Sequence, residues 1–166
     1  MNDEQSILTL QNQQRAPDGV KKYLFALKDQ ALIESVLIPN KKRTTLCLST
    51  QAGCALGCTF CATGAMGLNR NLNVDEIVGQ YTQIATLEEN SCRQENRPLK
   101  NIVFMGMGEP LANYNAVTRA IRILNAPWGC SIGARKITVS TVGLPAAIER
   151  LATFDIPVTL ALSLHA

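Results

Sequence analysis

The sequence predicts an α/β fold with a parallel sheet, and three observations carry that prediction. Short apolar runs rich in β-branched residues alternate with stretches of roughly 10–15 residues that have helical periodicity, the pattern of βαβ units. This order continues through the second half of the chain. Each predicted strand also leads into a loop of reactive or glycine residues, and such loops gather at the carboxyl edge of a parallel sheet, where α/β proteins bind ligands.

Length and composition exclude several classes of protein. The chain has 166 residues, of which 46% are hydrophobic and 17% charged, an ordinary globular mixture of about one domain at roughly 150 residues per domain. No apolar run approaches the ~18 residues of a membrane span, and the polar N-terminus is unlike a signal peptide. The net charge of +3 is compatible with nucleic acid but does not require it. Without an export signal the six cysteines are expected to be reduced, as in the cytoplasm.

The first third of the chain predicts a hairpin followed by one strand. About the first 16 residues show no periodicity and are expected to lack regular structure. Residues 20–27 and 31–39 form the predicted hairpin around a turn at residues 28–29. Residues 44–50, rich in β-formers, are predicted as the next strand.

A loop and a long helix come next. Residues 51–68, rich in glycine and cysteine, are predicted as a loop. Asn73 and Glu76 have the spacing of a capping box, so a helix is predicted over residues 74–88, followed by a polar loop over residues 89–98.

The remaining elements repeat the strand and helix pattern. The nearly continuous apolar run at residues 100–106 predicts a strand buried on both faces. A helix is predicted at 114–124, a strand at 136–141, a helix at 144–153 and a strand at 157–163. The loops that follow the predicted strands contain residues 51–61, 106–110, 141–143 and His165.

Three cysteines on the first of these loops indicate a metal centre. Cys54, Cys58 and Cys61 have the spacing C-x-x-x-C-x-x-C. A cubane iron–sulfur cluster held by three cysteines keeps one iron open, as a catalytic cluster requires. The alternative is a structural zinc site, which needs a fourth ligand such as Cys47 or Cys92.

The cysteine motif, with Phe60 before its third cysteine, resembles that of the radical S-adenosylmethionine (SAM) superfamily. The segment CLSTQAGCALGCTFCATGAMGLNRNL, followed by DEIVGQ, is similar to one branch, the RNA adenine methyltransferases. The motifs FMGMGEP, ITVSTVG and LALSLHA match the same branch in order and spacing. Four motifs in register make the resemblance specific.

The resemblance implies a fold and a domain division. Residues 44–166 are expected to form the N-terminal part of an incomplete radical SAM partial (βα) barrel with parallel strands. Residues 1–43 are expected to be the remnant of an N-terminal accessory region with the hairpin. The family's methyl-accepting cysteine near its C-terminus has no counterpart here, so the chain is expected to be a fragment that does not complete methylation alone.

The resemblance also implies the cofactor-binding residues. Cys54, Cys58 and Cys61 would hold a [4Fe–4S] cluster whose open iron binds SAM, and one electron would then yield a 5′-deoxyadenosyl radical. The residues that the resemblance implies for SAM binding are Gly108, Glu109, Ser140, Ser163, Leu164 and His165. A carboxylate such as Glu109 suits the SAM ammonium group, and the Ser140 hydroxyl suits its ribose or carboxylate.

Two further residues match catalytic positions of the family. Cys47 corresponds to the thiol that resolves a protein–RNA crosslink, with disulfide formation, after a methylated cysteine has delivered its carbon to adenine. Glu34 corresponds to the family's proton acceptor, and its apolar neighbours in the sequence suit a base. From the residues alone, the commoner interpretation of Cys47 is a small buried side chain. Glu34 is equally well interpreted as an outward-facing strand residue.

The implied activity is methyl transfer to carbon 2 of adenine in 23S rRNA and tRNA. A C8-specific methyltransferase, another radical SAM enzyme and a zinc-stabilised RNA-binding module remain alternatives. The implied partners are RNA and an electron donor such as flavodoxin, with no membrane partner, for a protein expected to be monomeric. The candidate phosphate contacts are Lys21, Lys22, Lys41, Lys42, Arg43 and Arg70.

Overall fold

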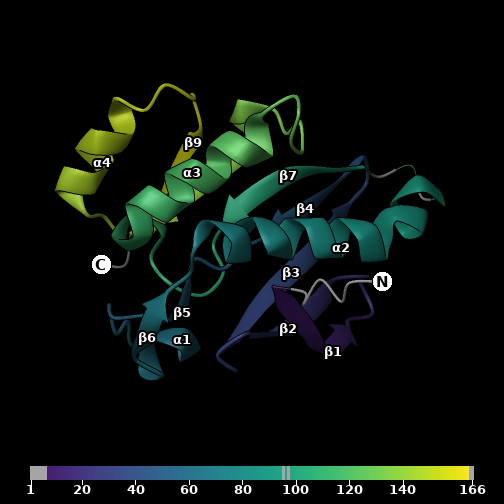
Figure 1. The fold of residues 1–166 in the computed structure, drawn as a ribbon, viewed down its shortest axis with the longest axis horizontal. Coiled ribbons are helices and arrows are strands. Elements are labelled where there is room, and N and C mark those ends of the chain that lie inside the picture. The colour runs from purple at the N-terminus through teal and green to yellow at the C-terminus, as the bar shows by residue number, and fades with distance from the viewer. Residues whose placement is uncertain (1–6, 95, 97, 165–166) are drawn as a thin grey trace.

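The computed structural model describes residues 7–94, 96 and 98–164 and has a seven-stranded sheet with helices on one side (Figure 1). The strands of the sheet are β1 (Leu8–Arg15), β2 (Lys21–Leu27), β3 (Leu32–Asn40), β4 (Arg43–Cys47), β7 (Leu99–Phe104), β8 (Ile137–Thr141) and β9 (Thr159–Leu162). They lie in the order β1-β2-β3-β4-β7-β8-β9. The first four are antiparallel to one another, and β4, β7, β8 and β9 are parallel. The predicted α/β fold with parallel strands is confirmed.

The helices and a small second sheet complete the fold. The helical elements are α1 (Ala62–Ala65), α2 (Val74–Gln94), α3 (Tyr114–Asn125) and α4 (Pro145–Ala152), with 3-10 turns η1 (Pro110–Asn113) and η2 (Ala134–Lys136). Strands β5 (Gln51–Gly53) and β6 (Leu68–Asn71) pair with each other and close the cysteine loop at its base. None of the helices in the described part of the chain combines the length and the apolar character needed to cross a membrane.

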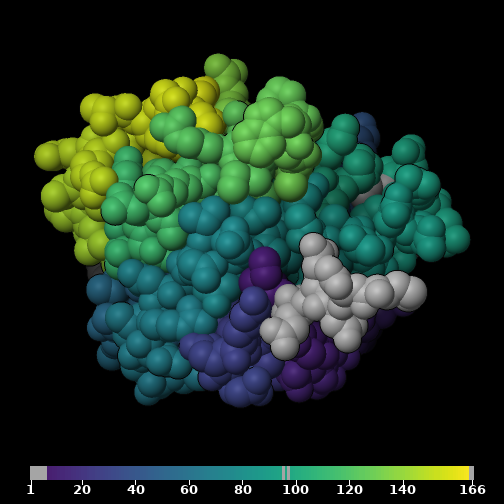
Figure 2. All heavy atoms as spheres, in the orientation of Figure 1, coloured from purple at the N-terminus to yellow at the C-terminus, as the bar shows by residue number. Residues whose placement is uncertain are grey.

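The helices cover one face of the large sheet, which we call the covered face. Its buried side chains include Phe25, Ile33, Leu37, Leu46, Ile102, Phe104, Ile137 and Val139. Figure 2 shows the atoms of α2 and α3, in teal and green, packed against each other on this side. On α3 the buried residues Val117, Ala120, Ile121 and Leu124 follow helical spacing, so the helix packs one apolar stripe into the core.

The opposite face, which we call the open face, is half-exposed. The residues of β7 alternate between the two faces, with Ile102 buried and both Asn101 and Val103 intermediate. The prediction of a strand buried on both faces is therefore wrong. Val103 is apolar although it lies on the open face. The sequence of β7 therefore reads as one apolar run and does not reveal that its residues alternate between the two faces.

Helix α2 begins as the sequence predicted. The Asn73 side chain accepts from the Glu76 backbone N–H at 2.9 Å, and the Glu76 carboxylate accepts from the Asn73 N–H at 2.9 Å. This is the capping box, which satisfies two N–H groups that have no partner within the helix. The helix continues to Gln94, six residues past the predicted end.

The N-terminal strand is a correction to the sequence analysis. β1 pairs antiparallel with β2 from Leu8 to Arg15, where no regular structure was expected. Only Leu8 of this strand is buried. Because an edge strand is held by its backbone pairing while its side chains face solvent, it left no hydrophobic pattern to detect. The predicted hairpin of β2 and β3 is confirmed.

Candidate functional site

The loops that follow β4 and β7 are joined at the carboxyl edge of the sheet. The backbone N–H groups of Thr50 and Gln51 both donate to the Met107 carbonyl, at 2.8 and 3.1 Å. The Gln51 side chain accepts from the Glu109 N–H at 2.8 Å. Gly108 has φ of +93°, and a Cβ there would collide with the Gln51 side chain, so glycine is required for this close approach. The structure therefore brings two of the predicted functional loops together.

The three motif cysteines lie on one loop between β5 and α1. Cys54, Cys58 and Cys61 are half-buried and carry free thiols. The Cys54 N–H donates to the Gly67 carbonyl at 2.9 Å, and the Cys61 N–H donates to the Cys58 carbonyl at 3.0 Å. Among the described residues, no three His, Cys, Asp or Glu side chains converge as a metal-binding group. The backbone thus holds the three cysteines on one short loop, with their thiols not gathered at a single point.

Cys47 is the last residue of β4, ahead of the cysteine loop in the chain, and lies on the open face of the sheet. Strand pairing aligns Val36, Cys47, Val103, Thr138 and Thr159 in one row across the sheet. Cys47 is buried, and burial raises the pKa of its thiol from 9.0 to about 11, opposed by a hydrogen bond from the Met105 backbone. At neutral pH the thiol is therefore protonated, and it reacts as a nucleophile only after a base has removed the proton.

This raised pKa predicts slow alkylation of Cys47. The thiolate is the reactive form, and a pKa two units higher leaves about a hundredfold less thiolate at pH 8. Iodoacetamide labelling, followed by peptide mass spectrometry, should be at least that much slower in the folded chain than in the urea-unfolded chain. The rate should rise about tenfold per pH unit until the pH approaches 11. Equal labelling rates in folded and unfolded chain at pH 8 would contradict this account.

The ends of β8 and β9 bring two predicted SAM-binding residues into contact. The hydroxyl oxygens of Ser140 and Ser163 lie 3.2 Å apart, and the Ser163 N–H donates to the Thr141 carbonyl at 2.8 Å. Ser140 is two residues beyond Thr138 and so shares the open face with Cys47. Leu164 is exposed, and the predicted site residue His165 lies outside the described residues.

Glu109 is buried and ties two loops together. One carboxylate oxygen accepts from the Leu111 N–H at 3.0 Å and the other from the Val142 N–H, also at 3.0 Å. The first bond caps η1, and the second links this loop to the segment after β8. The carboxylate therefore has a positioning function in this structure, which the sequence analysis did not anticipate.

Glu34 corrects the expectation of an apolar environment. Its carboxylate forms an ion pair with Lys22 at 2.9 Å, and the two side chains are 41% and 43% exposed. Its two sequence neighbours, Ile33 and Ser35, are buried on the covered face, because successive strand residues point to opposite faces. Glu34 lies on the open face, diagonal to Cys47 on the adjacent strand and so roughly 7–8 Å from it between backbones.

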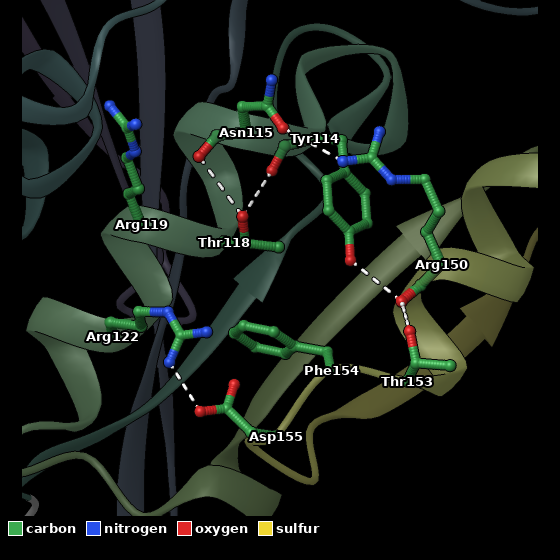
Figure 3. A pocket seen from close by; sticks show the side chains of 9 residues that line it. All are labelled: Tyr114, Asn115, Thr118, Arg119, Arg122, Arg150, Thr153, Phe154 and Asp155. Carbon is green, nitrogen blue, oxygen red and sulfur yellow. Dashed lines mark hydrogen bonds and ion pairs between the residues drawn. The ribbon is translucent and has the colours of Figure 1, made fainter.

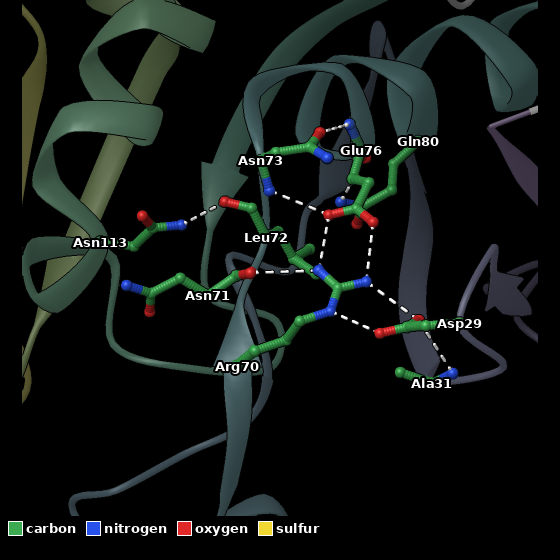
Figure 4. A network of polar contacts seen from close by, with 9 residues as sticks. All are labelled: Asp29, Ala31, Arg70, Asn71, Leu72, Asn73, Glu76, Gln80 and Asn113. Carbon is green, nitrogen blue, oxygen red and sulfur yellow. Dashed lines mark hydrogen bonds and ion pairs between the residues drawn. The ribbon is translucent and has the colours of Figure 1, made fainter.

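Arg70 is not available as a phosphate contact. Its Nε and Nη2 donate to the Asp29 carboxylate, Nη1 and Nη2 to the Glu76 carboxylate, and Nη1 also to the Asn71 carbonyl. These bonds use all five N–H donors of the guanidinium. Figure 4 shows Arg70 at the centre of this network, between the turn before β3 and the start of α2.

The other candidate phosphate contacts lie mostly away from the carboxyl edge. Lys21 pairs with buried Glu88. Lys41 and Lys42 are exposed at the turn between β3 and β4, which is at the amino end of β4. Arg43 begins β4 at the same end.

Sequence reasoning missed two buried amides that hold the site in place. Gln80 of α2 accepts from the Ser49 N–H at 2.9 Å and donates to the Ser49 carbonyl at 3.0 Å. The Asn113 side chain donates to the carbonyls of Thr50 and Leu72, at 2.8 and 2.7 Å. Both amides fix the segment just before the cysteine loop. For Gln80 the signal in the sequence is a polar residue at a helix position that should face the core, whereas Asn113 lies before the predicted helix and carries no such signal.

The donor chemistry of the cysteine loop fits an iron–sulfur cluster. Three free thiols on one loop supply three thiolate ligands. Cys92 lines a pocket together with Thr44, at the amino end of β4 and so at the other end of that strand from the cysteine loop. Cys92 is therefore badly placed to be the fourth ligand of a zinc site.

Comparisons with known proteins agree with this chemistry. A family model described as the radical SAM superfamily matches residues 48–166. The dual-specificity RNA methyltransferase RlmN of Syntrophobacter fumaroxidans is 49% identical over 163 residues, 98% of this chain and 46% of that protein. A probable RlmN of Dictyoglomus thermophilum is 51% identical over 89% of this chain and 41% of its own. A crystal structure of a radical SAM methyltransferase from Sphaerobacter thermophilus matches with a TM-score of 0.90 and 49% identity, over 97% of this chain and 46% of that one. The chain spans less than half the length of these relatives.

Proposed function

The chain belongs to the radical SAM superfamily, and we propose that it methylates carbon 2 of adenine in 23S rRNA and in tRNA. Members of the superfamily use a [4Fe–4S] cluster and SAM. The observation that carries the proposal is the joined carboxyl edge, where the cysteine loop, the Gly108–Glu109 loop and the Ser140–Ser163 pair lie on consecutive strands of a parallel sheet. The names of the similar proteins support RNA as the substrate.

The proposal gives each group of residues a task. Cys54, Cys58 and Cys61 hold the cluster, which when bound supplies the electron that breaks a carbon–sulfur bond of SAM. The loop that contains Gly108 and Glu109 receives the SAM amino group. Partners of the reaction are the RNA and an electron donor such as a flavodoxin.

The residues at the ends of β8 and β9 would hold another part of SAM. The hydroxyl groups of Ser140 and Ser163, which lie 3.2 Å apart, would donate to its ribose or carboxylate, and Leu164 and His165 would complete this part of the site. Because Glu109 bonds to both Leu111 and Val142, it keeps the loops after β7 and β8 at a fixed separation. The protein thereby holds the cofactor in one orientation before any chemistry occurs.

Cys47 and Glu34 are proposed to act on the substrate side of the sheet. Both lie on the open face, on adjacent strands. The Cys47 thiol has a raised pKa of about 11, so its Sγ proton must pass to a base before the sulfur can form a disulfide with the crosslinked cysteine sulfur. That sulfur's bond to the RNA-attached carbon breaks in the same step, and the adenine takes up the electron pair. Glu34 is partly exposed and pairs with Lys22, and its proposed task is to accept a proton.

Deletion of the gene for this protein tests the proposed activity without relying on an isolated chain. Nucleoside mass spectrometry of 23S rRNA and tRNA from the deletion strain should show loss of 2-methyladenosine, restored by the wild-type gene but not by a Cys58→Ala gene. Unchanged 2-methyladenosine would overturn the proposal. Loss of 8-methyladenosine instead would assign the protein to the C8-specific relatives.

A further inference from the structure

A groove between α3 and α4 carries three arginines that the proposed chemistry does not use. It has a volume of about 590 Å³ (Figure 3). It lies on the side of the molecule where the helices pack on the covered face of the sheet (Figure 1). Its lining residues are Tyr114, Asn115, Thr118, Arg119, Arg122, Arg150, Thr153, Phe154 and Asp155. Three guanidinium groups and one carboxylate give the groove a net charge of +2.

Two of the arginines are held in place by aromatic rings. The Arg150 guanidinium lies 4.0 Å from the centre of the Tyr114 ring, and that of Arg122 lies 4.9 Å from the centre of the Phe154 ring. The Tyr114 hydroxyl also donates to the Arg150 carbonyl at 3.0 Å. Stacking restricts these long side chains before any ligand arrives, which lowers the entropy cost of binding.

The third arginine has no partner among the described residues. Arg119 is exposed one helical turn before Arg122, and in Figure 3 its side chain lies at the edge of the groove and extends away from Arg122 and Phe154. The single carboxylate of the groove, Asp155, is paired with Arg122 at 2.7 Å. Arg119 and Arg150 therefore keep charges that no carboxylate of the groove neutralises.

We propose that this groove binds backbone phosphates of the substrate RNA, away from the target adenine. Guanidinium groups match the geometry of phosphate oxygens, and an open, polar, cationic groove suits an extended polyanion better than a small molecule, whose pockets are mostly apolar and enclosing. The groove begins at Tyr114, which directly follows η1, so one end of the groove lies next to the loop that follows β7 at the carboxyl edge. The inference rests on RNA being the substrate, as proposed above.

The test measures binding of a fluorescein-labelled, 20-nucleotide single-stranded RNA to the full chain by anisotropy, from 50 to 200 mM salt. Arg119→Gln should weaken binding about three- to tenfold and lower the slope of log affinity against log salt by about 0.7, the value for one lost phosphate contact on a single strand. Arg93→Gln is the matched control, since it removes the same charge from α2, where Arg93 is exposed and pairs with Glu89. It should bind RNA like the wild type.

Equal affinity and salt slope for Arg119→Gln and Arg93→Gln would overturn the inference, as would an absence of RNA binding by the wild type. If the groove binds an acidic protein and not RNA, the two variants should have equal affinity and equal salt slope. Iron–sulfur absorbance is recorded on the same wild-type sample. Its absence would count against the proposed function and leave the groove to be judged by the RNA titration alone.

Discussion

Substitution of Cys58 by alanine should abolish the iron–sulfur cluster. Anaerobic reconstitution of the wild-type chain with iron and sulfide should give the broad visible absorbance of a [4Fe–4S] cluster and about four irons per chain, the composition of a cubane held by three cysteines. Cys58 lies in the middle of the loop, and its removal leaves two thiolates, too few to retain the cluster. The expected result is loss of most of the absorbance and of the bound iron.

Cys92→Ala is the matched control for this experiment. Cys92 is also a half-buried cysteine outside any disulfide, but it lies near Thr44 at the amino end of β4. Its removal should leave iron content and absorbance unchanged. Stoichiometric zinc in the purified chain, together with loss of that zinc in Cys92→Ala, would instead support the structural zinc site.

Substitution of Gln80 by methionine should strongly destabilise the fold. Gln80 is fully buried, and its amide bonds to both backbone groups of Ser49 and to the Ser35 hydroxyl. Methionine fills a similar volume but leaves three buried polar groups without partners. At about 1–3 kcal/mol for each unsatisfied group, the free energy of unfolding should fall by about 3 kcal/mol or more. Urea denaturation followed by circular dichroism measures this change.

Gln94→Met is the control for Gln80→Met. Gln94 is exposed at the last position of the same helix, so its substitution should change the free energy of unfolding by no more than about 0.5 kcal/mol. Equal stabilities of the two variants would show that the Gln80 amide does not hold the segment before the cysteine loop.

The order of strands and helices could be predicted because it depends on local pattern. Alternating apolar runs and helical stretches gave the parallel strands β4, β7, β8 and β9, and the Asn73–Glu76 capping box gave the start of α2. Each of these features depends on only a few residues that are close together in the sequence. Element ends were less predictable: α2 runs six residues past its predicted end, through a mostly exposed stretch that a Glu89–Arg93 ion pair spans.

The environment of individual side chains depended on which face the helices cover, and that is not local information. Glu34 has apolar neighbours along the chain but lies on the half-exposed face beside Lys22. Arg70 has the appearance of a free basic residue, and its partners Asp29 and Glu76 come from two other elements. Glu109 was expected to face a ligand, and its carboxylate accepts from two backbone N–H groups of neighbouring loops.

Reductive cleavage of SAM tests the central claim, that this carboxyl edge is a radical SAM site. The reconstituted chain, given dithionite and SAM under anaerobic conditions, should release methionine and 5′-deoxyadenosine, measured by chromatography and mass spectrometry. Cys58→Ala should release neither above the background without protein, and Cys92→Ala should match the wild type. A wild-type chain that carries a full complement of iron and leaves SAM intact would contradict the account.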